Sequence, residues 1–160
     1  MVRMGELAAS AVADDVLVSI GLGSCIGLAL VDRRAAVAGL AHVVLPDSGG
    51  KSGPESFKFA DHAVPELIER VVAAGGRRST LDAVLVGGAS MFAVSTAALE
   101  VGQRNEAAVR DQLGAARINV LAAATGGDRG RTIRVHVGSR RVTVREAGGS
   151  VQELVPEVVA

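Results

Sequence analysis

The only cysteine of the chain lies in the glycine-rich stretch GLGSCIG at residues 21–27. Three interpretations of this stretch compete: a phosphate-binding loop, a tightly packed core position, or a turn that presents Cys25 as a nucleophile. A thiol is mostly protonated at neutral pH, and a neighbouring imidazole that takes its proton leaves a thiolate able to attack a carbonyl carbon. The imidazolium then protonates the leaving group. A nucleophilic Cys25 therefore needs a histidine within reach.

His42 is the histidine that the predicted strands bring closest to Cys25. The apolar runs that contain the two residues are separated by DRRA at 32–35. With Arg33 and Arg34 at the tip of a hairpin, Cys25 stands directly opposite His42, and directly opposed residues have Cβ atoms about 4.5–5.5 Å apart. A slip of one residue would place them on opposite faces of the sheet. The glycines before Cys25 also free the backbone, so that its N–H groups could stabilise an oxyanion.

A structural role for Cys25 stays open on the residues alone, because a single Cys in an apolar strand is often a small core residue. The phosphate-binding interpretation is set aside. The dinucleotide fingerprint needs glycine where Ile26 stands, and a P-loop ending at residues 50–52 needs glycine where Leu45 stands. His62 in a predicted helix and His136 in a predicted hairpin are interpreted as solvated surface residues.

The composition favours a single domain that does not bind nucleic acid. The 160 residues are 49% hydrophobic and 2% aromatic, and Lys+Arg and Asp+Glu are balanced at 17 each. This balance removes the argument for a basic surface, and the lack of aromatics removes the argument for base stacking. One cysteine fits a reducing compartment, and no apolar run approaches the roughly 20 residues that span a bilayer. We expect a cytoplasmic protein with no membrane insertion, no metal and no cofactor.

The elements that must position Cys25 and His42 are expected to be mostly strands. The predicted strands are 12–20, 25–31, 36–45, 82–86 and 117–124. The predicted helices are 58–74, with a kink or a start at Pro65, and a helix capped by Asn105 that runs to about Ala116. A sheet that is apolar on both faces needs a covering layer on each side. We therefore predict an α/β fold, a layered sandwich of mixed β-sheet with flanking helices.

Three further segments complete the prediction. Alternating apolar residues on both sides of Gly138-Ser139 indicate a hairpin with a two-residue type II′ turn. The Pro/Gly/Ser-rich segment 46–56 is predicted to be a functional loop beside the cleft. The apolar residues of the tail 148–160 fall at helical spacing, which indicates a helix docked on its own domain, with a frayed terminus as the alternative.

Five segments in the order GLGSCIG, GLAHVVLPDSGG, LVGGASMF, VGQRN and ATGGDRGR resemble the CheD family of chemotaxis proteins. The match runs from about Gly5 to Glu146. That family comprises chemoreceptor glutamine deamidases with a layered α/β fold similar to the catalytic domains of deamidating bacterial toxins. The resemblance implies Cys25 as the nucleophile and His42 as the general base and acid. It also implies that Ser19, where the family has Thr, orients His42 with a freer χ1 than Thr would have.

The resemblance also implies an activity and partners. A protein-glutamine glutaminase of this kind is a cysteine-dependent amidohydrolase that converts glutamines of methyl-accepting chemoreceptors to glutamate with release of ammonia. Family members also bind the phosphatase CheC, which is therefore an expected partner. The alternative is a non-catalytic or weakly catalytic module that docks on CheC or on receptors. We assign the deamidase domain to residues 1–147 and the tail to 148–160. The residues expected to flank the site are Gly23, Ser24, Gly49 and Gly50.

Overall fold

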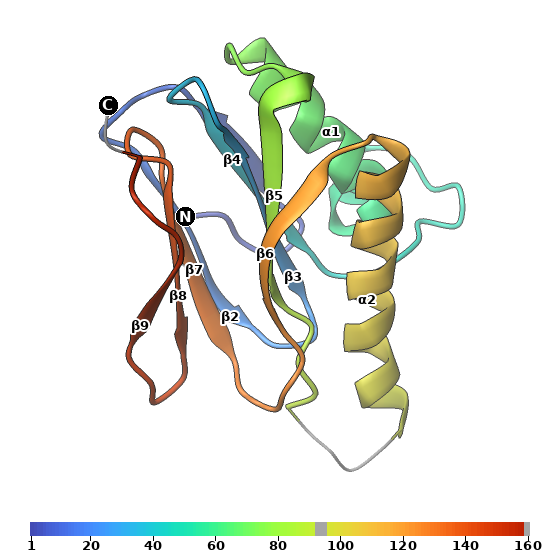
Figure 1. The fold of residues 1–160 in the computed structure, drawn as a ribbon. Coiled ribbons are helices and arrows are strands. Elements are labelled where there is room, and N and C mark those ends of the chain that lie inside the picture. Colours follow the sequence, from blue (N-terminus) through green and yellow to red (C-terminus); the bar gives the residue numbers. More distant parts are fainter. Residues whose placement is uncertain (92–95, 159–160) are drawn as a thin grey trace.

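The computed structural model describes residues 1–91 and 96–158, with the side chains of residue 54 and residues 96–99 left out. Two β-sheets are stacked face to face, and two helices cover the outer face of the larger sheet (Figure 1). The predicted layered α/β sandwich is confirmed. Within the described ranges, no helix is both long enough and apolar enough to cross a lipid bilayer.

The larger sheet is mixed and the smaller one is antiparallel. In spatial order, the larger sheet contains β1 (Leu7–Ser10), β4 (Ala38–Val43), β3 (Ile26–Asp32), β5 (Leu81–Gly87) and β6 (Asn119–Thr125), and only β5 and β6 run parallel. The smaller sheet contains β2 (Val16–Leu22), β7 (Arg131–His136), β8 (Arg141–Glu146) and β9 (Val151–Val155). The helices are α1 (Ala60–Ala73) and α2 (Thr96–Ala115), with short 3₁₀ turns η1 (Pro54–Lys58) and η2 (Arg78–Thr80).

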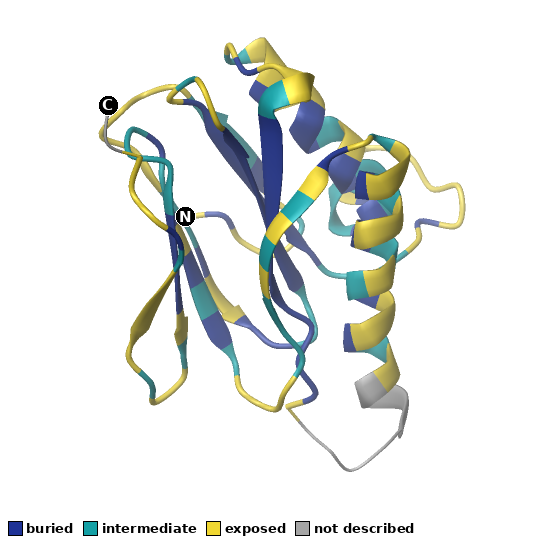
Figure 2. Cartoon of the chain, viewed as in Figure 1, coloured by how far each residue is buried: buried dark blue, intermediate teal, exposed yellow. Residues whose placement is uncertain are grey.

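Two apolar cores explain why the central strands are buried on both faces (Figure 2). In β3, Leu28 and Leu30 pack beneath the helices, whereas Ala29 and Val31 pack between the two sheets. Successive side chains of a strand point to opposite faces, so a strand between two layers needs apolar residues at every position. The continuous apolar runs of β3, β4 and β5 follow from this requirement.

The β3–β4 hairpin has a different register from the predicted one. Gly27, not Cys25, pairs with His42, and Cys25 lies one residue before β3. The connecting loop spans residues 33–37 because the carboxylate of Asp32 accepts hydrogen bonds from two backbone amides of the loop, at 2.7 and 3.1 Å. The error is a shift of two residues. Cys25 packs against the core between the two sheets, which is also the side of β4 on which His42 lies, so both residues remain on the same side of the larger sheet.

The two predicted helices are confirmed, but their first and last residues differ from the predicted ones. The segment 58–74 forms α1 with Pro65 inside it. The predicted cap at Asn105 is wrong, since α2 begins at Thr96 and Asn105 lies in its interior. A cap signal is local, and the polar side chain of Asn105 is engaged in tertiary hydrogen bonds instead. The strand at Leu7–Ser10 is not predicted by the sequence pattern.

The C-terminal half contains one confirmed register and two corrections. Ile133 pairs with Val144, which is the register that the predicted hairpin at Gly138-Ser139 requires. The type II′ turn is wrong, because Arg140 and not Gly138 has the positive φ, 59°. Gly138 is needed for a close approach, since a Cβ there would lie 2.6 Å from the Ala13 carbonyl oxygen. The predicted tail helix is also wrong: Val151–Val155 forms β9, which pairs with β8 and so packs on its own domain.

Candidate active site

The loop that carries Cys25 is fixed to the end of β5 by backbone hydrogen bonds. The amide of Ala89 donates to the carbonyl of Gly23 at 2.8 Å, and the amide of Gly88 donates to the carbonyl of Cys25 at 2.9 Å. Loop residues held in this way change conformation less freely than a solvated loop does. The position of Cys25 is therefore set by the turn that follows β5, far away in the sequence.

Gly87 allows this contact. A Cβ at Gly87 would lie 2.1 Å from the carbonyl oxygen of Cys25, and Gly87 has a φ of 119°. Only glycine adopts this backbone conformation without strain, and only glycine leaves room for the carbonyl. The segment LVGGASMF thus contributes backbone shape to the site.

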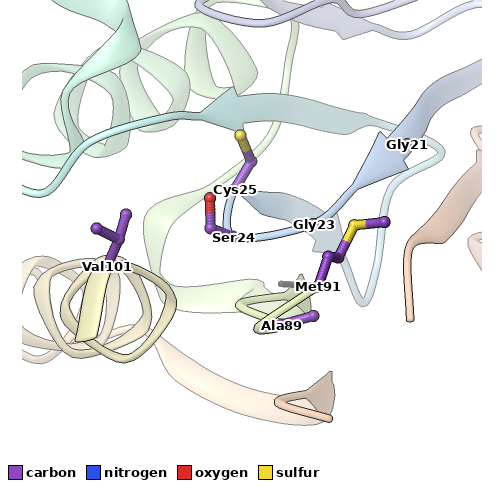
Figure 3. Close-up of a pocket in the computed structure, with 7 residues that line it drawn as sticks. All are labelled: Gly21, Gly23, Ser24, Cys25, Ala89, Met91 and Val101. Carbon is purple, nitrogen blue, oxygen red and sulfur yellow. The ribbon is translucent and has the colours of Figure 1, made fainter. Parts of the chain in front are cut away.

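Cys25 opens onto a surface cavity of about 410 Å³. Its lining residues are Gly21, Gly23, Ser24, Cys25, Ala89, Met91 and Val101 (Figure 3). None of these side chains carries a charge when the thiol is protonated. In Figure 3 the side chain of Cys25 projects from one side of its loop, and Met91 and Ala89 lie on the other. A Cβ at Gly23 would lie 2.7 Å from the Met91 sulfur, so Met91 covers Gly23 closely. The cavity suits a neutral group better than an ion.

His42 lies in β4, on the side that faces the smaller sheet, and is 3% exposed. Neither ring nitrogen has a formed hydrogen bond to the described part of the chain. Burial lowers the pKa of His42 below its ordinary value, while the nearby Val2 carbonyl and Glu6 carboxylate act in the opposite direction. The Val2 carbonyl therefore lies close to the ring without the geometry of a hydrogen bond. At neutral pH the imidazole is uncharged and able to accept a proton.

Ser19 lies in β2 and is fully buried. Its hydroxyl donates to the Val2 carbonyl at 2.7 Å. Ser19 and His42 therefore approach the same carbonyl from the two sheets, and the N-terminal segment lies between them. The structure shows no hydrogen bond from Ser19 to a described nitrogen of His42. The role of Val2 could not be predicted from the sequence, because a backbone carbonyl has no side-chain signature.

Cys25 is half-buried, and burial raises the pKa of its thiol; its own backbone N–H partly offsets the rise. Together with the lowered pKa of His42, this indicates a resting state with a neutral thiol and a neutral imidazole. A preformed thiolate–imidazolium pair is not favoured before substrate arrives. The imidazole is then a base during the attack.

Gly49 and Gly50 lie on the loop that precedes η1. Both are exposed and have positive φ values. The loop is anchored to α1, because the hydroxyl of Ser48 donates to the carboxylate of Asp61 at 2.7 Å and the backbone amide of Ser48 donates to the same group at 3.0 Å. Gly23 and Ser24 line the cavity of Cys25, whereas Gly49 and Gly50 are not among the described residues that line it.

A metal site finds no support in this part of the chain. Among the described residues, no group of three or more His, Cys, Asp or Glu side chains is placed to hold a metal ion. The cavity beside Cys25 offers a thiol, a serine hydroxyl and backbone groups.

The buried state of His42 predicts a pH dependence of stability. Below about pH 6.5 the unfolded chain protonates this histidine, whereas the folded protein resists protonation because its pKa is lowered. The free energy of unfolding is therefore expected to fall as the pH is lowered below about 6.5, and to be independent of this group above that pH. Denaturant titrations of wild type and His42→Gln at pH values from about 5 to about 8 measure the free energy of unfolding of each protein as a function of pH. Parallel pH profiles for the two proteins would contradict the prediction.

The fold and the site define an α/β two-sheet protein with a single thiol at a neutral surface cavity and a buried imidazole on the neighbouring strand. Residues 44–146 match the family model described as CheD chemotactic sensory transduction. The chain belongs to the CheD family.

Curated relatives from bacteria and archaea cover most of the chain. A protein of Clostridium botulinum (strain Eklund 17B / Type B), named probable chemoreceptor glutamine deamidase CheD, is 43% identical over 86% of this chain and 87% of its own. A protein of Methanococcus vannielii with the same name is 38% identical over 96% of this chain and 97% of its own. The chemoreceptor glutamine deamidase CheD of Thermotoga maritima is 39% identical over 89% of each chain.

Proposed function

We propose that this protein is a chemoreceptor glutamine deamidase that acts in the cytoplasm. It hydrolyses the side-chain amide of selected glutamines in methyl-accepting chemoreceptors and releases ammonia. The observation that carries the proposal is the placement of the only thiol of the chain at a neutral cavity, one residue before the strand that pairs with His42. The names of the relatives support the substrate class.

In the proposed reaction, Cys25 is the nucleophile and His42 is the base. As the sulfur attacks the amide carbon, the imidazole accepts the thiol proton, and the carbonyl oxygen becomes an oxyanion. The C–N bond then breaks, the imidazolium gives its proton to the leaving nitrogen, and a thioester and ammonia form. Water, deprotonated by the same imidazole, attacks the thioester and returns the thiol together with glutamate. The atoms balance without a metal or a cofactor.

The neutral lining of the cavity supports an amide substrate over a carboxylate product. An amide enters a site without cations at a lower desolvation cost than a carboxylate does. The product is a carboxylate at neutral pH, since the ordinary pKa of glutamate is about 4.3. The site therefore favours release of the converted side chain.

Ser19 is proposed to act on His42 indirectly. Its hydroxyl holds the Val2 carbonyl at 2.7 Å, and that carbonyl lies beside the imidazole. A fixed carbonyl next to a ring N–H limits the orientations of the ring. Ser19 is therefore a positioning residue in this proposal.

A binding module is the second candidate, because the resting state of the site does not distinguish it from a deamidase. The thiol and the imidazole are both neutral at rest, as in an ordinary buried pair, and a weakly catalytic protein would show the same state. In that case the protein acts mainly by docking on receptors or on CheC. The two candidates differ in whether ammonia is released.

The deciding experiment incubates the purified full-length protein with cytoplasmic fragments of chemoreceptors. The proposal expects release of ammonia that is stoichiometric with glutamine-to-glutamate conversion, located by peptide mass spectrometry. Fragments with the converted glutamines replaced by alanine are the matched control and should release none. Tight binding to fragments or to CheC without any ammonia would favour the binding module.

A further inference from the structure

Asn105 connects the chain segments that carry Cys25 and His42. It lies in the interior of α2 and is fully buried. Its side-chain nitrogen donates to the carbonyl of Ser24 at 2.9 Å and to the carbonyl of Val44 at 2.9 Å. Ser24 immediately precedes Cys25, and Val44 is two residues after His42. One amide group thus joins both sides of the site.

The bridge lies where β3 and β4 stop pairing. Their last pair is Ile26 with Val43. Beyond it, the backbone amide of Val44 donates to the backbone carbonyl of Lys58 at 2.8 Å and no longer to a residue of β3. The carbonyls of Ser24 and Val44 are part-buried, and backbone acceptors removed from water are nearly always hydrogen-bonded. A primary amide has two N–H donors on one nitrogen, so it satisfies both carbonyls and fixes their separation.

Close packing of α2 brings Asn105 to this place. Gly102, one turn earlier, lies so near the end of β5 that a Cβ would be 2.7 Å from the Gly88 carbonyl oxygen. Val109 and Leu113 on the same face are fully buried in the core beneath the helices. The close packing of α2 therefore makes it a rigid support, and the geometry of the site depends on where α2 holds the side-chain amide of Asn105.

The side-chain oxygen of Asn105 is also informative. It is buried and has no hydrogen-bond partner in the described part of the chain. Leaving a buried acceptor unsatisfied is unfavourable. The unsatisfied oxygen does not stabilise the fold. It is present because, among side chains of this size, only a primary amide provides two N–H donors on one nitrogen, and a primary amide always includes a carbonyl oxygen.

We propose that Asn105 is a positioning residue of the active site, which sets the distance between the Cys25 loop and the strand that carries His42. Asn105 is not among the described residues that line the cavity. It acts through the backbone of Ser24 and Val44. The kinetic part of this inference rests on the proposed deamidase function; the geometric part does not.

The test compares Asn105→Leu, which keeps the size but removes both donors, with Val109→Ala one turn further along α2. Val109 is equally buried but bonds to neither site segment. We expect Asn105→Leu to lower kcat by about 10- to 100-fold and to change KM much less, since misplaced reacting groups lose rate at this scale. Val109→Ala is expected to lower Tm and to leave kcat at temperatures below Tm unchanged. Asn105→Gln, which restores the donors, should recover part of kcat.

Alkylation of Cys25 by iodoacetamide gives a readout that needs no substrate. Release of the Ser24 carbonyl exposes the thiol, so the pH midpoint of alkylation in Asn105→Leu should move down toward that of free cysteine, while Val109→Ala keeps the wild-type midpoint. Should Asn105→Leu not fold, Asn105→Ala is measured in the same way. Equal kcat losses in the Asn105 and Val109 variants, or an unchanged midpoint in a folded Asn105 variant, would overturn the inference. Absence of ammonia release from wild type would refute the proposed function. The alkylation comparison would then still decide whether Asn105 positions the Cys25 loop.

Discussion

Replacing Cys25 with alanine is expected to lower ammonia release from receptor fragments by at least about 10³-fold, because removal of a nucleophile abolishes the covalent route. The thiol is small and half-buried, so the fold should persist with little change in Tm. Ammonia assays and thermal melts on the same preparations measure both quantities.

Cys25→Ser is the matched variant in this experiment. It keeps the shape and a hydroxyl but has a much higher pKa at the attacking atom, so it should be nearly as inactive as Cys25→Ala. Binding of receptor fragments should survive in both variants. Wild-type ammonia release by either one would show that the reaction does not use this thiol.

Gly87→Ala is expected to have the second largest effect, although Gly87 does not line the cavity. The new Cβ would overlap the carbonyl oxygen of Cys25, and the positive φ would add backbone strain of about 1–3 kcal/mol. The Cys25 loop must move away from β5, which breaks the hydrogen bond from the Gly88 amide. We expect loss of deamidation together with a clear decrease in Tm.

Gly114→Ala provides the control for this substitution. Gly114 lies in α2, has no positive φ, and a Cβ there would meet no atom within 4 Å. Alanine at such a helical position stabilises by about 0.5–1 kcal/mol and should leave activity unchanged. Full activity in Gly87→Ala would mean that the Cys25 loop tolerates displacement and that the close approach is not needed for function.

The layers of the fold and the register of one hairpin can be predicted from the amino-acid pattern alone. Continuous apolar runs required strands covered on both faces, and the two-sheet sandwich follows. The pairing of Ile133 with Val144 was predictable because β7 and β8 alternate apolar and polar residues, so a slip of one residue would bury the exposed Arg134 and Arg145. The segments GLGSCIG and AHVVLP also indicate Cys25 and His42 as the candidate catalytic pair.

The register of β3 and β4 was decided by the tertiary structure. Both strands are apolar at nearly every position, so a shift of two residues changes no face and leaves no trace in the pattern. The carboxylate of Asp32 selects the register, because it accepts hydrogen bonds from two backbone amides of the loop and also from the backbone amide of Arg77 and the hydroxyl of Thr80. That preference depends on residues more than forty positions away.

The structure of the tail and the role of Asn105 were also decided by contacts with residues distant in the sequence. Val151, Leu154 and Val155 fit one face of a helix, but the free edge of β8 offers a row of backbone partners, and the segment pairs there as β9. Asn105 was predicted to be a helix cap because a capping signal depends only on residues nearby in the sequence. Its partners Ser24 and Val44 lie 81 and 61 residues away. Periodicity encodes which face of an element is buried, whereas hydrogen bonds between distant segments exist only once the layers have packed.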